Sequence, residues 1–470
     1  MLFNSIEFAI FLPLVFLLYW YVFSKNLRVQ NLLILAISYF FYGWWDWRFL
    51  SLIAFSSTID YLVGLQMGRA EKQSRRKLLL AISLFVNLGM LGFFKYYNFF
   101  VESFVESFSL LSIDLNVSTL RVILPVGISF YTFQTLSYSI DIFRRKLEPT
   151  KDAVAFFAFV SFFPQLVAGP IERASNLLPQ FFEKRIMTAR NLAIGSRLIV
   201  WGMFKKVCVA DNLAVFVNQV YGAPDQYTGL VCVVATVFFA FQIYCDFSGY
   251  SDIAIGTARL LGFRLMTNFR TPYFSQSIRE FWGRWHISLS TWFRDYVYIP
   301  LGGSRVGVLK WQRNLIITFL VSGLWHGANW TFVVWGGIHG IANSIEALNR
   351  KYGVLKFNIP FINFLYTFTI VCISWVFFRA NNVSEAFAFI QNMFVPTIAG
   401  IQNVVAPYKL LVMVSMLGLM LFFEIVPHFN FFRKQIWKHR AIRWSFYYLL
   451  IILLFVFGRT SDTQFIYFQF

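Results

Sequence analysis

A series of long apolar runs constrains the fold more than any other feature of this chain. Nearly uninterrupted runs occupy residues 6–23, 32–45, 78–94, 230–244, 361–378, 410–425 and 445–457. An α-helix needs roughly 20 apolar residues to cross a bilayer, and fewer where other helices bury it. Since lipid offers no partners for backbone N–H and C=O groups, such runs fold as helices. We therefore predict an all-α, polytopic membrane helical bundle with about eleven spanning or re-entrant helices.

The composition supports a membrane protein with a single domain. Hydrophobic residues make up 58% of the chain and charged residues 13%, whereas a soluble domain carries roughly 25% charged residues. No linker rich in Ser, Gly or Pro and no internal repeat divides the sequence, so we expect one domain over residues 1–470. The N-terminus lacks a basic region and a small-residue cleavage site, which indicates that 6–23 is a retained helix.

The net charge of +19 does not indicate nucleic-acid binding, because the basic residues fall in loops between apolar runs. This distribution is typical of cytoplasmic loops. The basic loop 69–77 is therefore predicted in the cytoplasm, and the stretch with Glu102 and Glu106 outside. That stretch alternates acidic and aromatic residues, as in a helix lying on the membrane surface.

The cysteines predict no metal site and no redox motif. None of the four forms a CxxC or a metal-ligand spacing, and all stand in apolar sequence (Cys208, Cys232, Cys245 and Cys372). We interpret them as small buried side chains.

Residues 121–212 differ from the preceding apolar runs because Pro, Gly and polar residues interrupt the apolar sequence. Pro164, Gly169 and Pro170 break a helix in FFPQLVAGPIER (162–173). Broken backbone at membrane depth is tolerated where it is buried in protein or lines a cavity. We therefore predict that this section lines a cavity.

Two carboxylates, Asp246 and Asp252, stand among apolar neighbours in residues 241–263. They could serve acid–base catalysis or bind a cation. Alternatively, Asp246 could accept backbone N–H bonds at the start of a short re-entrant helix, a role that aspartate favours. We favour this structural interpretation.

The segment 264–313 is basic and rich in tryptophan, and it does not resemble a membrane span. It holds eight basic residues against two carboxylates, Glu280 and Asp295. One interpretation is a cytoplasmic cradle for an anionic donor, with Arg279, Arg284 and Arg294 on its phosphates and Trp285 stacking on a base. The other is anchoring at lipid headgroups, which requires no ligand. The two interpretations are compatible.

Three of the five histidines lie within residues 281–340. His326 has Gly327 beside it, and glycine allows a close approach of backbone or substrate. Burial disfavours a charged imidazolium, so a neutral ring could accept a proton from a hydroxyl as a general base. The alternative is a histidine satisfied by a helix carbonyl. His286 could contact substrate or pin its segment, and His339 is expected to be structural because its spacing from His326 does not match one helix face.

Three long strings resemble the membrane-bound O-acyltransferases, and within them the branch of bacterial alginate O-acetyltransferases. They are FQIYCDFSGYSDIAIGTARLLGF (241–263), FWGRWHISLSTWFRDYVYIPLGGSR (281–305) and SGLWHGANWTFVVWGGIHG (322–340). The resemblance implies a helical bundle with a substrate tunnel or funnel and a catalytic core over residues 120–345. It also implies acyl transfer to a hydroxyl. It implies that His326 is the catalytic histidine and His286 a supporting one, and that Asp295 orients His286 or anchors the segment.

The resemblance also implies the reaction partners and the location. It implies acetyl-CoA as a cytoplasmic donor, no bound cofactor, an exported polysaccharide as acceptor, and an extracytoplasmic acetyltransferase partner of the SGNH type. The expected location is the bacterial inner membrane. D-alanyl transfer to teichoic acid is the alternative within the family. A multi-pass transporter is the alternative of another class, but the paired repeats typical of transporters are absent from the sequence.

Overall fold

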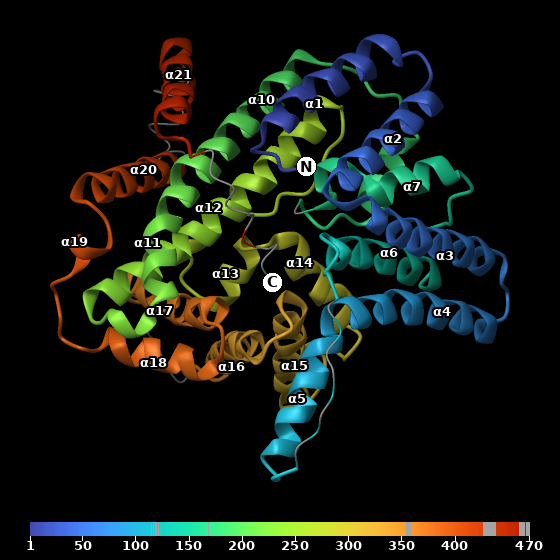
Figure 1. The fold of residues 1–470 in the computed structure, drawn as a ribbon. Coiled ribbons are helices and arrows are strands. Elements are labelled where there is room, and N and C mark those ends of the chain that lie inside the picture. Colours follow the sequence, from blue (N-terminus) through green and yellow to red (C-terminus); the bar gives the residue numbers. More distant parts are fainter. Residues whose placement is uncertain are drawn as a thin grey trace. The chain divides into compact units, whose positions relative to one another are not determined.

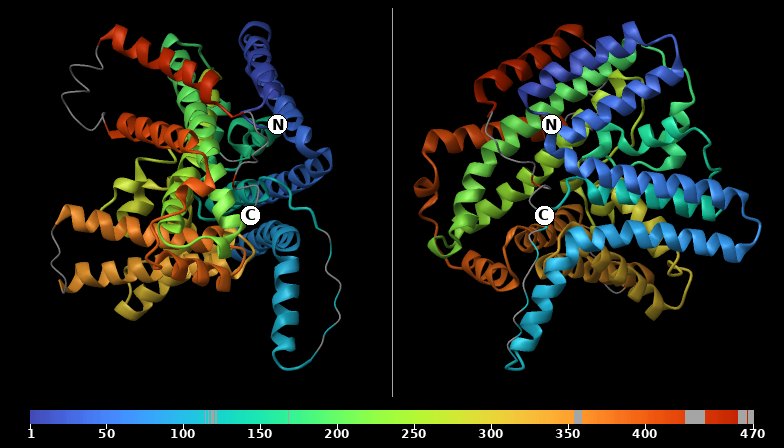
Figure 2. Two further views of the ribbon diagram at one scale, coloured as in Figure 1. Left: turned by 60° about the vertical axis from the view of Figure 1, so that its left-hand side comes forward. Right: turned by 45° about the vertical axis from the view of Figure 1, so that its right-hand side comes forward.

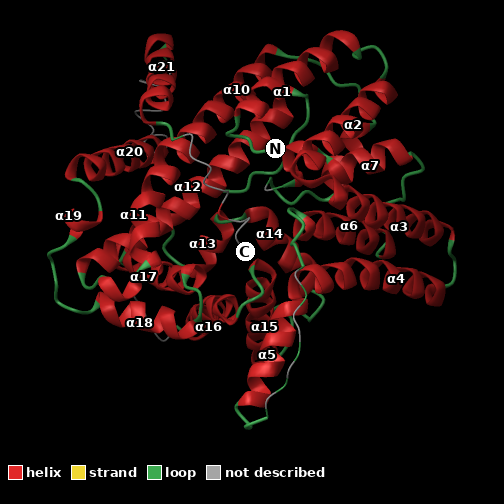
Figure 3. Cartoon of the chain, viewed as in Figure 1, coloured by secondary structure: helices red, strands yellow, loops and turns green. Residues whose placement is uncertain are grey.

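A computed structural model describes residues 1–470 except 114, 116, 118, 119, 121, 168, 354–358, 426–438, 460–465 and 467–470. The described residues form helices and loops without a strand (Figure 3). The all-α prediction is therefore confirmed. Backbone contacts divide the chain into two compact units, which comprise 1–196 with 254–266 and 197–253 with 267–470.

Six helical segments of the described residues are long and apolar enough to cross a membrane. They are Leu27–Arg69, Gln73–Ser109, Leu230–Leu260, Pro360–Arg379, Pro407–Ile425 and Arg440–Phe457. Two shorter apolar segments are Ile6–Val22 and Ala153–Leu166. These segments confirm a polytopic membrane protein, and the total of about eleven spanning or re-entrant helices stays a prediction.

The first unit is built on three adjoining helices, α3, α4 and α6, which lie side by side in Figures 1 and 2. Its helices are α1 (Ile6–Leu17), α2 (Leu27–Asp46), α3 (Leu50–Arg69), α4 (Gln73–Leu91), α5 (Tyr97–Ser109), α6 (Ile128–Phe143), α7 (Ala153–Ser161), α8 (Phe163–Leu166) and α9 (Ala174–Leu177). The fully buried Asp60 of α3 accepts hydrogen bonds from Asn87 Nδ2 on α4 (2.8 Å) and Ser139 Oγ on α6 (2.9 Å). These bonds satisfy a carboxylate among apolar helices and fix their contact.

The second unit contains the segments that carry the histidines. Two helices are shared between the units, α10 (Ala189–Met203) and α12 (Leu230–Leu260), and the others are α11 (Asp211–Gly222), α13 (Ile278–Arg284), α14 (Ile287–Phe293), α15 (Val308–His326), α16 (Trp330–Tyr352), α17 (Pro360–Arg379), α18 (Val383–Met393), α19 (Ile401–Val404), α20 (Pro407–Ile425) and α21 (Arg440–Phe457). The α15–α16 pair makes the densest helix contact of the described chain.

Glycines permit the close approach of α15 and α16. A Cβ atom at Gly323 would lie 3.3 Å from the Cα of Gly336, and one at Gly336 would lie 3.2 Å from the Cα of Gly323. Each would also clash with a carbonyl oxygen of the other helix. The two backbones therefore touch where a side chain would separate them, as in other membrane helix pairs with small residues at the interface.

Asp246 does not cap the start of a helix, because Asp246 and Asp252 lie well inside the continuous helix α12. Asp246 Oδ2 does accept a backbone N–H bond, from Ile466 (2.8 Å). The charged partners of the two carboxylates are lysines from the π-helix η5 (Phe204–Ala210). Lys206 Nζ lies 2.8 Å from Asp246 Oδ1 and 2.9 Å from Asp211 Oδ1, and Lys205 Nζ lies 2.6 Å from Asp252 Oδ2. A buried charge needs an opposite charge or hydrogen bonds, and these pairs supply them.

Candidate active site

His326 is the last residue of α15, and its side chain is buried. Its Nδ1 lies 2.7 Å from the carbonyl oxygen of Ser322, one turn earlier on the helix. Because a carbonyl can only accept a hydrogen bond, Nδ1 carries the proton, and the Nε2 of the neutral ring carries the lone pair. The ring is enclosed by Trp325 and Trp335, with centroids at 4.9 and 4.7 Å. This tautomer can accept a proton at Nε2.

His286 precedes α14 and is fully buried in a left-handed backbone conformation (φ 42°). Its Nδ1 lies 3.0 Å from Asn268 Oδ1, and Asn268 Nδ2 donates to Ser251 Oγ on α12 (3.2 Å). Contacts of this kind hold a residue in a rarely populated conformation. Burial, and next the proximity of the second titratable imidazole at His326, lower the pKa of His286 well below its ordinary value. The ring is therefore a neutral hydrogen-bond donor through Nδ1.

The two histidines flank one indole ring. The centroid of Trp325 lies 4.9 Å from that of His326 and 6.2 Å from that of His286. The structure therefore brings together two residues that are 40 positions apart in the sequence.

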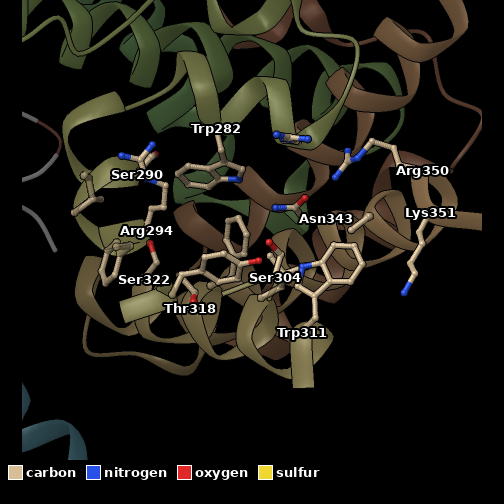
Figure 4. Close-up of a pocket in the computed structure, with 17 residues that line it drawn as sticks. Trp282, Ser290, Arg294, Ser304, Trp311, Thr318, Ser322, Asn343, Arg350 and Lys351 are labelled. Carbon is tan, nitrogen blue, oxygen red and sulfur yellow. The ribbon is translucent and has the colours of Figure 1, made fainter. Parts of the chain in front are cut away.

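A cavity of about 580 Å³ lies against α15, and Figure 4 shows the side chains that line it. His286, Trp325 and His326 are not part of this lining. It is lined by α13, α14, α15, α16 and the loop before α15, and its wall includes Ser322, whose carbonyl fixes His326. The lining residues are Arg279, Trp282, Leu289, Ser290, Phe293, Arg294, Tyr298, Ser304, Trp311, Leu315, Thr318, Phe319, Ser322, Asn343, Ala347, Arg350 and Lys351. The cavity therefore reaches Ser322, one helical turn before His326.

The lining of the cavity is positively charged. It contains Arg279, Arg294, Arg350 and Lys351 and no carboxylate. Burial, and next the positive charge of Arg279, lower the pKa of Arg350 from its ordinary value. The smaller part of this shift comes from the nearby cation Arg279, whereas Glu346, whose Oε2 lies 3.9 Å from Arg350 Nη1, acts in the opposite direction. An anionic ligand would stabilise two cations held this close together.

Carboxylates outside the lining hold this arrangement in place. Glu346 on α16 accepts backbone N–H bonds from Ile278 (2.7 Å) and Arg279 (3.3 Å) at the start of α13, and burial raises the pKa of Glu346. Asp295 Oδ1 pairs with Arg294 Nε at 2.7 Å, and this hydrogen bond raises the pKa of the guanidinium. α13 is thus fixed to α16 on one side of the cavity.

The predicted donor residues divide into two groups. Arg279 and Arg294 line the cavity, whereas Arg284 and Trp285 do not. Arg284 pairs with Glu280 one turn earlier in α13. The Trp285 ring is fully buried against Phe281 (5.6 Å) and Trp375 (5.1 Å). Protein therefore covers both faces of the Trp285 ring. The tryptophans that line the cavity are Trp282 and Trp311 instead.

The sequence analysis missed Arg350 and Lys351, because they lie at the end of α16, outside the basic segment 264–313. Two basic residues in the last turn of a long helix are a common complement to the helix dipole, so they carried no distinct signal. Among the described residues, no group of three or more His, Cys, Asp and Glu side chains could hold a metal ion.

Comparison with known proteins gives one family and several relatives. The model of the "MBOAT, membrane-bound O-acyltransferase family" matches residues 143–379. A "Probable alginate O-acetylase AlgI" from Azotobacter vinelandii is 44% identical over 84% of this chain and 78% of its own length. A "Peptidoglycan O-acetyltransferase" from Helicobacter pylori is 37% identical over 84% of this chain and 80% of its own. A "Teichoic acid D-alanyltransferase" from Bacillus subtilis is 26% identical over 54% and 69%.

Proposed function

We propose, from the premise that this chain belongs to the membrane-bound O-acyltransferase family, that it takes acetyl groups from cytoplasmic acetyl-CoA for the O-acetylation of an exported polysaccharide. The chain is a multi-pass membrane protein and an O-acyltransferase. The acetyl donor, its cytoplasmic side, the bacterial inner membrane and the polysaccharide acceptor belong to the proposal.

The observation that carries the proposal is the fixed tautomer of His326 beside a cationic cavity. With the proton on Nδ1 held by the Ser322 carbonyl, Nε2 can remove the proton of an acceptor hydroxyl. The hydroxyl oxygen then attacks the thioester carbonyl, and the tetrahedral intermediate collapses with release of the CoA thiolate. The proton on Nε2 passes to that thiolate, so the ring returns to its starting state.

The cavity supports acetyl-CoA as donor. CoA carries phosphate groups, and the lining offers Arg279, Arg294, Arg350 and Lys351 to bind them. The apolar part of the lining, including Leu289 and Phe319, suits the rest of a thioester-bearing arm. Lipid-headgroup anchoring remains the competing interpretation of the basic segment.

The relatives favour acetyl over D-alanyl transfer. The named acetylases are 44% and 37% identical over most of the chain, whereas the D-alanyltransferase matches 54% of it. The higher identity to the alginate O-acetylase supports an alginate-like polysaccharide as the proposed acceptor. An SGNH-type extracytoplasmic partner that completes the transfer stays a prediction from the resemblance.

The purified protein in proteoliposomes with labelled acetyl-CoA and alginate oligosaccharides tests the proposal. His326→Asn keeps an N–H donor for the Ser322 carbonyl but lacks Nε2. We expect a loss of activity of about 10²–10⁴-fold, the usual contribution of a general base. Lys184→Gln, which removes an exposed charge outside the site, is the control. Acetylation by the His326→Asn protein at the control rate would refute the assignment.

The donor site is tested separately by titration with acetyl-CoA. Arg279→Gln or Arg350→Gln should raise the concentration for half-maximal rate more than it lowers the maximal rate, because these charges bind ground state and transition state alike. The requirement should also grow as ionic strength rises. Headgroup anchoring predicts instead a lower protein yield with unchanged donor dependence.

A further inference from the structure

His339 on α16 is a fully buried histidine that the proposed chemistry does not use. Its Nδ1 lies 3.3 Å from Trp282 Nε1, and its Nε2 lies 2.9 Å from Ser374 Oγ. The indole N–H can only donate, so Nδ1 is the acceptor. Ser374 donates its single hydroxyl proton to the Val371 carbonyl (2.7 Å), so its oxygen accepts from Nε2–H. Both nitrogens of one neutral tautomer are thereby assigned.

The residue that His339 holds forms part of the cavity wall. Trp282 lines the cavity (Figure 4), and its ring packs against Phe319 (5.4 Å), which lines the cavity as well. Rotation of the indole would change the shape of this wall. The hydrogen bond that Trp282 Nε1 donates to His339 Nδ1 holds the indole in the orientation in which its N–H points toward His339 on α16.

His339 also supports the surroundings of His326. Its ring centroid lies 5.0 Å from that of Trp335, and Trp335 in turn lies 4.7 Å from His326. A phenylalanine would fill the same space, since the neighbouring rings of Phe281 and Phe319 stack nearly parallel to the imidazole. A phenylalanine would lack both the acceptor for the indole N–H of Trp282 and the N–H donor to Ser374.

We propose that His339 is a positioning residue whose Nδ1 fixes the indole of Trp282 in the wall of the donor cavity. The inference rests on the proposed function insofar as the cavity holds acetyl-CoA. Its role is distinct from that of His326, because His339 acts through Trp282 and does not exchange a proton.

Two substitutions separate the acceptor from the rest of the side chain. His339→Asn places a carbonyl oxygen about where Nδ1 stands and can still accept from Trp282. His339→Gln places its amide about where Nε2 stands and keeps only the bond to Ser374. We expect His339→Asn to retain the donor dependence of the wild type. His339→Gln should raise the half-saturating acetyl-CoA concentration about tenfold, with a smaller change in maximal rate.

Trp282→Phe removes the N–H donor and completes the experiment. In that background the two substitutions at His339 should have equal effects, because no indole N–H remains to be held. The same cycle is read from thermal unfolding in detergent, which involves no donor. Coupling between positions 282 and 339 for Gln but not for Asn supports the positioning role. Equal behaviour of the Asn and Gln proteins with Trp282 intact overturns it. The remaining outcome is coupling in thermal unfolding together with a wild-type rate that does not depend on acetyl-CoA. That result would refute the proposed donor and leave the positioning contact established.

Discussion

A single methyl group on either of two facing glycines should inactivate the enzyme. Gly323 on α15 and Gly336 on α16 bring the two helix backbones into direct contact, and an alanine Cβ at either position would clash with a backbone carbonyl of the other helix. Real Cβ atoms essentially never come within 3.0 Å of another heavy atom. Backbone atoms cannot rotate away, so the helices must separate by about 1–2 Å to restore ordinary contact distances of roughly 3.5–4.0 Å.

The consequence for activity follows from the position of His326, three residues after Gly323. The ring of His326 packs on Trp335, which is the residue before Gly336. Separation of the helices therefore moves the proposed base relative to the cavity. A misplacement of about 1 Å at reacting groups can cost about 10²-fold in rate, and overpacking costs about 1–3 kcal/mol of stability. We expect Gly323→Ala and Gly336→Ala to reduce acetylation about 100-fold.

Gly337→Ala is the matched control, since it places the same methyl group on the same helix. Its Cβ would lie 3.7 Å from Leu320 Cδ2, an ordinary van der Waals contact. This variant should keep its activity and gain up to about 1 kcal/mol from the higher helix propensity of alanine. The assay is acetyl transfer in proteoliposomes, normalised to folded protein by size-exclusion chromatography. Equal activity of the Gly336→Ala and Gly337→Ala proteins would refute the argument that backbone contact sets the geometry of the site.

Three further predictions concern stability and topology. Lys206→Met leaves two buried carboxylates without their cation and should destabilise the protein by about 3–5 kcal/mol in thermal unfolding in detergent. Combination with Asp246→Leu should recover part of the loss, and no recovery would argue against the ion pair. Because the pKa of His286 is lowered in the native state, the unfolded chain binds a proton below about pH 6.5 that the native state does not, and the free energy of unfolding should fall as pH falls. His286→Asn should reduce the slope of the free energy of unfolding against pH by up to about 1.4 kcal/mol per pH unit. Cysteines introduced at the exposed positions Ser74 and Ser112 should label from the cytoplasmic and the opposite side, respectively, and labelling of both from one side would contradict the predicted orientation.

The donor site could be predicted only in part from the sequence. The basic segment pointed to Arg279 and Arg294, and both line the cavity. The same reasoning selected Arg284 and Trp285, because it treated all cations and tryptophans of the segment as equally available. Which face of a short helix such as α13 turns toward a cavity depends on the helix packed against it, and Glu346 on α16 makes that contact.

The sequence by itself determined the class of protein and the region of its chemistry. Apolar runs are local features of the sequence. Each forms a helix that removes its apolar surface from water, whichever helix it packs against. The strings at 281–305 and 322–340 mark the region of the chemistry, because they contain His286, His326 and His339.

Only the tertiary structure decided how these residues act. The pairing of Lys206 with Asp246, the contribution of Arg350 and Lys351 to the cavity, and the bond from Trp282 to His339 each join segments far apart in the chain. Ion pairs and hydrogen bonds depend on distances and directions within a few tenths of an ångström. Such geometry arises from the packing of whole helices, down to the contact between Gly323 and Gly336, and no local pattern of residues encodes it.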